Sequence, residues 1–283
     1  MALRTMGNRV YADFLMPSRL EAYARLLESA LAAGYRLIST ERFWRLIVDR
    51  AVDPNGRYLI LRHDIDTDPR TAGAMWELER RLGIESSYYF RLSTLDIGLM
   101  QAIGEHGGDA GYHFEELATI AKRRRIRNPN AVASVFPEAQ DLFHRNLERL
   151  RSQTGLPMRV AASHGDFVNR KLGVRNAAIL ADPAFRLAAG VDLEVNDEAF
   201  MVHVSSRHSD TEHPTYWIPD DPLSPIRRGD PVSAIQAGNP VVYLLVHPRQ
   251  WHVNRSFNAR DDVLRVWEGL TYQLPARHPL RTR

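Results

Sequence analysis

Apolar positions change between helical and strand-like spacing along much of the chain, which predicts that helices and strands follow one another. Helical spacing predicts helices over residues 18–33, 40–51, 70–82, 137–153 and 259–274. Thr40 is expected to cap the second of these helices at its N-terminus. Apolar runs predict strands within residues 57–63, 85–93, 109–115, 155–165 and 239–248. Between residues 184 and 235 the periodicity fades, and irregular structure with long loops is expected.

This alternation favours parallel strands joined by crossover helices, and hence an α/β protein. The 283 residues are 44% hydrophobic and 25% charged, as in an ordinary globular protein. No linker rich in Gly, Pro or Ser divides the chain. We therefore expect a single domain over residues 1–283, with core motifs at about 58–252 and an N-terminal helical segment, 1–50, packed on them.

Charge and cysteine content exclude several classes of protein. A net charge of +3 is too small to argue for nucleic acid binding. Without cysteine there are no disulfides, and any metal must be held by His, Asp or Glu. No apolar stretch has the length of a signal peptide core or a membrane span, so the expected location is the cytoplasm. The oligomeric state is left open by the sequence.

Groups that can bind a metal or move a proton follow four of the predicted strands. In chain order they are His63, Asp64, Asp66, His113, Glu115, His164 and His247. In a parallel α/β barrel the active site lies at the carboxyl ends of the strands, so these side chains are expected to converge. A lone His at a strand end is more often a capping or core residue, and the inference therefore depends on the whole set.

Strand alternation refines the set. Residues two apart point to the same side of a strand, so Arg62, Asp64 and Asp66 share a side, and His113 and Glu115 share another. Arg62 is expected to keep a neighbouring carboxylate ionised through a charge-assisted pair.

Three stretches, "LRHDID", "GYHFEEL" and "LLVHP", resemble motifs of the polysaccharide deacetylase family, carbohydrate esterases with a NodB-type domain. The likeness is to a divergent branch with an Arg-His-Asp-x-Asp first motif. It implies a distorted (β/α) barrel, usually seven-stranded, and a divalent metal, most often zinc. It also implies removal of acetyl groups from amino sugars or sugar hydroxyls. Asp64 matches the general base and His247 the catalytic acid, while Asp66 and His113 match metal ligands.

The chain departs from the family pattern at the third ligand. Leu117 stands where the second motif normally has another His, four positions after the first, and "ASHGDFVNRK" replaces the usual Arg-Pro-Pro-Tyr-Gly motif. We expect His164 to replace the missing ligand, because imidazole suits zinc well. Glu115 is the second choice, and a site without metal is the remaining alternative.

The expected function is a metal-dependent hydrolase that removes an acyl group from an amino sugar or sugar intermediate of glycan biosynthesis. Asp64 would take a proton from the attacking water, and His247 would protonate the leaving group. The alternative is a catalytically degenerate barrel that binds a sugar or nucleotide-sugar without hydrolysis. No Gly-x-Ser-x-Gly motif or Gly-rich phosphate loop supports a serine nucleophile or a dinucleotide site.

Two segments are candidates for substrate contacts. The basic stretch "AKRRRIRNPN" contains Arg124, and it is either a solvated loop or a rim that holds an anionic substrate such as a nucleotide-sugar or lipid diphosphate. The stretch "HPTYWIPDD" contains Trp217, which either stacks on a sugar or packs under a loop.

Overall fold

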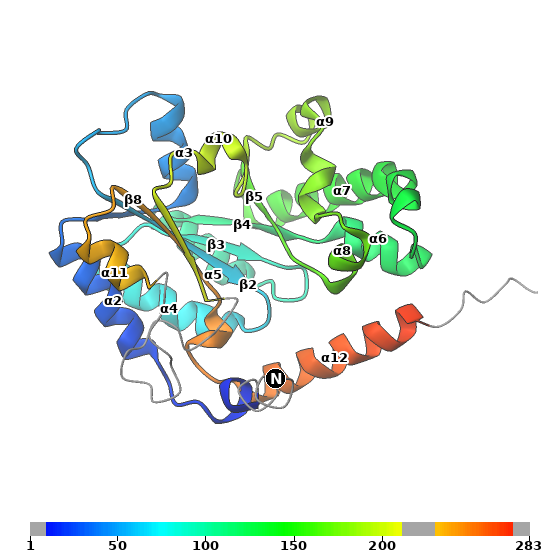
Figure 1. The fold of residues 1–283 in the computed structure, drawn as a ribbon, viewed down its shortest axis with the longest axis horizontal. Helices are drawn as coiled ribbons and strands as arrows, with labels where there is room; N and C mark the ends of the chain where they lie inside the picture. Colours follow the sequence, from blue (N-terminus) through cyan, green and yellow to red (C-terminus); the bar gives the residue numbers. More distant parts are fainter. Residues whose placement is uncertain (1–9, 211–229, 274–283) are drawn as a thin grey trace, which may run out of the picture.

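A sheet of eight parallel strands forms the centre of the protein (Figure 1). The computed structural model describes residues 10–210 and 230–273. Seven strands follow one another across the sheet in the order β6-β5-β4-β3-β2-β8-β7, and the short β1 pairs with the first half of β2. Their bounds are β1 Arg36–Ile38, β2 Tyr58–Ile65, β3 Ser87–Phe90, β4 Asp109–Phe114, β5 Val160–Ser163, β6 Leu193–Glu194, β7 Ser206–Ser209 and β8 Val241–Val246.

The sheet curls into a half-barrel with helices between its strands, which confirms the expected distorted (β/α) barrel. Among the described residues no ladder joins β6 to β7, so the barrel is open between these edges. The helices are α2 Leu20–Ala32, α3 Thr40–Val48, α4 Pro69–Arg81, α5 Ile97–Glu105, α6 Glu116–Arg124, α7 Phe136–Thr154, α8 Phe167–Leu172, α9 Pro183–Ala188, α10 Glu198–Met201, α11 Pro231–Gln236 and α12 Arg255–Gln273. Shorter helical turns are η1 Tyr11–Leu15, η2 Pro129–Val135, η3 Asn176–Leu180 and η4 Pro248–Gln250.

The start of α3 differs by one residue from the prediction. Ser39, not Thr40, is the N-cap, and its side chain accepts a hydrogen bond from Arg42 N. The Ser39 hydroxyl also donates to Asp109 Oδ1 at 3.0 Å, which ties the start of the helix to the start of β4. Because this hydroxyl makes both bonds, Ser39 takes the capping position.

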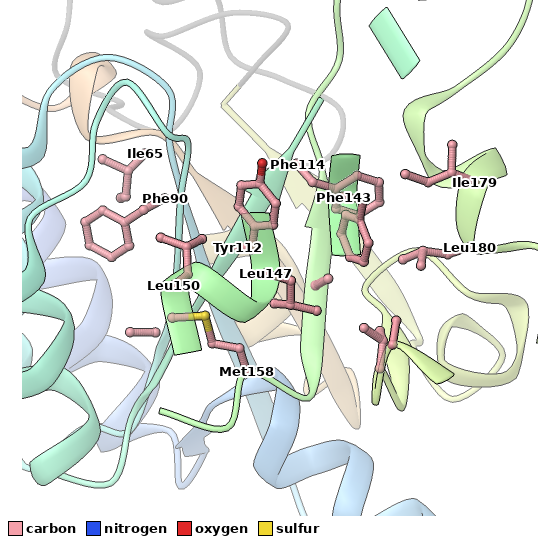
Figure 2. Packing of buried hydrophobic residues seen from close by; sticks show 14 of the residues in the cluster. Ile65, Phe90, Tyr112, Phe114, Phe143, Leu147, Leu150, Met158, Ile179 and Leu180 are labelled. Carbon is pink, nitrogen blue, oxygen red and sulfur yellow. The ribbon is translucent and has the colours of Figure 1, made fainter. Parts of the chain in front are cut away.

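The alternation of β4 separates the core from the candidate site. Tyr112 and Phe114 point to one side and pack on Phe143 of α7, with ring centroids 5.8 and 4.9 Å from the Phe143 centroid (Figure 2). His113, between them, therefore points to the other side of the sheet. Burial of these aromatic rings fixes the register of β4, and with it the direction of the His113 side chain.

The prediction for residues 184–235 was only partly right. Two short strands, β6 and β7, and three short helices, α9 to α11, occur in this region. A two-residue strand and the polar strand Ser-Arg-His-Ser carry no apolar alternation that could reveal them. The sheet recruits these strands through neighbours that are distant in sequence, β5 and β8.

The last helix, α12, is attached to the barrel through charged side chains. Near its start, Asp261 Oδ2 lies 2.8 Å from Arg249 Nη1. Near its end, Glu268 Oε2 lies 2.7 Å from Lys122 Nζ of α6. The helix thus runs from the end of β8 to α6 (Figure 1). Within residues 10–210 and 230–273, no helix has both the length and the apolar character needed to cross a membrane.

Candidate metal centre

The ends of β2, β4 and β5 bring together one carboxylate and two imidazoles. Asp66, His113 and His164 each offer one ligand atom, and these three atoms lie within 4.8 Å of one another. Asp66 Oδ1 is 3.2 Å from His113 Nε2 and 3.6 Å from His164 Nε2. The three residues predicted as ligands therefore converge, although they are up to 98 positions apart in the chain (164 − 66).

His63 does not belong to this group, although it precedes Asp64 directly. It points to the opposite side of β2, where its Nε2 lies 2.8 Å from the Tyr23 hydroxyl and 2.9 Å from Glu79 Oε1. Its ring also stacks on Tyr88, with centroids 3.9 Å apart. Strand alternation explains the difference, because neighbouring residues face opposite sides. His63 therefore belongs to a buried polar cluster that joins β2 to α2 and α4.

Both candidate imidazole ligands are held with Nε2 toward Asp66. His113 Nδ1 is 3.0 Å from the carbonyl oxygen of Ala162, so Nδ1 carries the proton and Nε2 is left as the acceptor in the neutral ring. His164 Nδ1 is 3.0 Å from Glu115 Oε2, which favours the same tautomer. Imidazoles that bind metals are commonly oriented through such a bond on the other ring nitrogen.

Asp66 has the properties expected of a metal ligand. Its Oδ1 is buried, and no hydrogen bond of good geometry reaches it from the described residues. Burial raises the pKa of Asp66, but the neighbouring His164, His113 and His247 side chains hold that pKa well below its usual range. An ionised oxygen that faces two imidazole nitrogens without a hydrogen bond fits a cation between them. The residues present can therefore hold a metal ion.

Glu115 orients His164 and is itself held by Arg91. Arg91 Nη2 lies 2.8 and 2.9 Å from the two Glu115 oxygens, and Arg91 Nη1 donates to the backbone oxygen of Asp66 at 3.1 Å. Burial raises the pKa of Glu115, but the bonds to His164 and Arg91 lower it far below its ordinary value. No sequence pattern pointed to Arg91, because its partners come from two other strand ends.

Glu115→Gln is expected to weaken metal binding by roughly 10- to 100-fold without abolishing it, because the hydrogen-bond partner of His164 changes while the ligands remain. Titration of the variant and the wild type with a divalent metal in a competing chelator measures the change. An affinity equal to that of the wild type would exclude Glu115 from the orienting role.

Leu117, at the position of the missing family ligand, is fully buried in α6 and belongs to the main hydrophobic cluster. Its side chain packs among residues such as Ile120 and Phe143 of that cluster. A metal-binding side chain at this position would have to leave the core. His164, from β5, reaches Asp66 instead.

Asp64 lies beside the metal-binding group and forms a double ion pair with Arg62. Arg62 Nε and Nη2 are each 2.7 Å from an oxygen of Asp64, as the shared strand side predicted. Burial raises the pKa of Asp64, but Arg62, with His113 and His247, lowers it below its usual value. Asp64 Oδ2 is also 3.4 Å from His113 Nε2. An ionised carboxylate therefore adjoins the three candidate ligands.

His247, at the end of β8, faces the same group, with Nε2 4.0 Å from Asp66 Oδ2. Its Nδ1 lies 2.5 Å from Asp210 Oδ1, and its backbone N–H donates to Asp210 Oδ2 at 2.7 Å. Burial lowers the pKa of His247, but the charge and hydrogen bond of Asp210, with Asp66 and Asp64, raise it to about 9. Trp251 Nε1 donates to the same carboxylate at 3.1 Å.

Asp210 was missed by sequence reasoning, although it is the closest partner of His247. It follows β7 directly in "SRHSD", and its backbone N–H continues the ladder to Leu245 O at 3.3 Å. An acidic residue directly after a predicted strand is a candidate site residue, as Asp64 was. Here the strand itself could not be recognised, because it is short and polar.

Of the two residues predicted to contact the substrate, the structure describes only Arg124. Arg124 is at the end of α6, where Nε lies 3.2 Å from Glu138 Oε2 and more than half of the side chain is exposed. Its role in substrate binding stays a prediction. Trp217 lies outside the described residues.

No known family model matches the chain, and no curated protein sequence matches it either.

Proposed function

We propose that the protein is a metal-dependent hydrolase that removes an acyl group, such as acetyl, from an amino sugar or sugar intermediate of glycan biosynthesis in the cytoplasm. One observation carries the proposal. A group able to hold a metal ion, the Asp64 carboxylate and the His247 imidazole meet at the carboxyl ends of β2, β4, β5 and β8. The three motifs that resemble polysaccharide deacetylases contribute Asp64, Asp66, His113 and His247 to this arrangement.

Asp66, His113 and His164 would hold the metal, with zinc the best fit to two imidazoles and one carboxylate. A divalent ion with an open position supplies Lewis acidity, which lowers the pKa of water and stabilises negative charge on a carbonyl oxygen. The Asp66 side chain keeps 20% of its surface exposed, although its Oδ1 is buried.

Asp64 would act as the general base and His247 as the general acid. Asp64 is ionised and adjoins the ligand set, so it can accept a proton from an attacking water. Arg62 holds Asp64 in place but also lowers its basicity, which suits a base that must stay ionised at neutral pH. His247 is protonated at neutral pH, and its Nε2 can donate that proton to a leaving amine or hydroxyl.

Release of acetate tests the proposal. Purified protein is incubated with N-acetylated sugars, nucleotide-linked and free, and with O-acetylated sugars, and acetate is measured. Turnover that is removed by a chelator and restored by a divalent metal supports the hydrolase. Binding of the sugars without acetate release, at any metal tried, would favour the non-catalytic sugar-binding alternative.

Asp210→Asn is expected to move the alkaline limb of the activity profile to lower pH. His247 acts in its protonated form, so the rate falls as pH rises through its pKa, and loss of the Asp210 charge lowers that pKa. The profile of kcat/KM against pH for the variant and wild type measures the shift. An unchanged alkaline limb would remove the Asp210–His247 pair from the acid role.

A further inference from the structure

Two adjoining cavities lie where the end of α6 meets the end of α12, and Tyr272 lines both. Both are open to solvent, and their volumes are about 290 Å³ and 210 Å³. The first is lined by Lys122, Arg123, Arg125, Glu268, Thr271 and Tyr272. The second is lined by Arg127, Lys171, Tyr272 and Gln273. Five lining side chains are therefore cations, and one is a carboxylate.

This concentration of cations is not explained by α6 alone. Basic residues in the last turn of a helix are stabilised by the helix dipole, which accounts for Lys122 and Arg123. Arg127 follows the helix, and Lys171 comes from α8. Both lysines of the chain, Lys122 and Lys171, line these cavities. Two segments, residues 122–127 and α8, thus bring positive charge to one place.

Tyr272 is held between the cations of the second cavity. Lys171 Nζ lies 5.3 Å and Arg127 Cζ 5.9 Å from the centre of its ring. Arg127 Nη2 also donates to the Tyr272 backbone oxygen at 2.8 Å. No carboxylate among the described residues forms an ion pair with Lys171. The ring therefore fixes the position of two cations and separates them from the cations of the first cavity.

We propose that the two cavities together bind a diphosphate group. Each cavity offers its own cations, so two neighbouring phosphoryl groups match the arrangement better than one. Guanidinium groups donate paired hydrogen bonds to phosphate oxygens, and a lysine ammonium adds a point charge. The binding site itself does not depend on the proposed hydrolase activity. The further inference that the diphosphate carries the sugar substrate does rest on the proposed hydrolase activity.

The position relative to the metal centre supports that carrier. Helix α6 follows β4, which places His113, and α8 follows β5, after which comes His164. Lys122 Nζ lies 2.9 Å from Asp166 Oδ2, and Asp166 is the N-cap of α8, two residues after His164. A diphosphate in the cavities would thus contact α6 and α8, the helices that follow the strands that position His113 and His164.

Arg125 provides a test with a matched control. Its backbone is left-handed, with φ of 53°, and Arg50, after α3, has nearly the same conformation, with φ of 54°. Glycine adopts this conformation without the steric cost of a Cβ. Arg125→Gly and Arg50→Gly each remove one positive charge and relieve the same kind of backbone strain. Only the first of them changes the cavities.

Binding of inorganic pyrophosphate is measured by calorimetry on the full chain. Wild type is expected to bind, Arg125→Gly to bind about ten-fold more weakly or worse, because a charge-assisted hydrogen bond is lost, and Arg50→Gly to bind as wild type does. Both variants should remain folded at the temperature of the measurement. Absent binding to wild type, or an equal change in both variants, would overturn the proposal.

Two further measurements ask whether pyrophosphate binds at the metal centre instead, and which kind of diphosphate the cavities prefer. Asp66→Ala should bind pyrophosphate as wild type does, whereas loss of binding there would show that pyrophosphate sits on the metal instead. Uridine diphosphate and geranyl diphosphate then distinguish a nucleotide carrier from a lipid carrier, and tighter binding of either supports the site. Inorganic phosphate that binds as tightly as pyrophosphate would contradict the pairing of the two cavities.

Discussion

His164→Ala is expected to release the metal while the barrel stays folded. Asp66 and His113 would remain, and two protein ligands seldom hold zinc against competition from water. His164 lies at the rim, after β5, so its loss removes little from the hydrophobic core. Elemental analysis of the purified variant measures the metal, and circular dichroism checks the fold. We expect less than about a tenth of the wild-type metal content, because loss of a hydrogen-bond partner of a ligand already costs roughly 10- to 100-fold in affinity and loss of the ligand itself costs more.

His144→Ala is the matched control, because it removes an exposed imidazole from α7, away from the three ligands. It should retain full metal content. Asp66→Ala should lose the metal as His164→Ala does. Normal metal content in His164→Ala, with loss in Asp66→Ala, would show that another group is the third ligand.

Asp64→Asn is expected to reduce turnover by roughly 100-fold or more while the metal stays bound. Asparagine keeps the shape of the side chain but cannot accept the proton. The substitution also leaves Arg62 without its carboxylate partner, and a broken buried pair costs about 3–5 kcal/mol of stability. Acetate release must therefore be read together with metal content and the melting temperature.

Asp68→Asn is the control for this substitution. Asp68 caps α4 on the same loop, by accepting from Arg70 N and Thr71 N, and asparagine is an equally good N-cap. Its activity and stability should stay close to those of the wild type. If Asp64→Asn is folded, loaded with metal and nearly as active as Asp68→Asn, Asp64 is not the base.

The fold could be predicted where strands are long and apolar. β2 and β8 are buried along their whole length, and their apolar runs are plain in the sequence. The side of each strand that faces the site also followed from alternation, as Arg62 and Asp64 show. His63 was a candidate site residue because of its residue type alone. Its side of the strand places it in the core instead.

The supporting residues could not be predicted, because their contacts join strand ends that are distant in sequence. Asp210 and His247 are 37 positions apart, and Arg91 and Glu115 are 24 apart. Neither pair has a local spacing that would suggest it. His164 could be predicted only in part. Its strand was predicted, but its distance from Asp66 depends on how the sheet curls.

Metal content of the wild-type protein tests whether Asp66, His113 and His164 form a metal site. The purified chain, before and after incubation with zinc, manganese or cobalt and removal of the excess by gel filtration, is analysed for bound metal. We expect one tightly bound divalent ion per chain, held by Asp66, His113 and His164. A folded protein that retains none of these metals under any of the conditions would contradict the hydrolase mechanism.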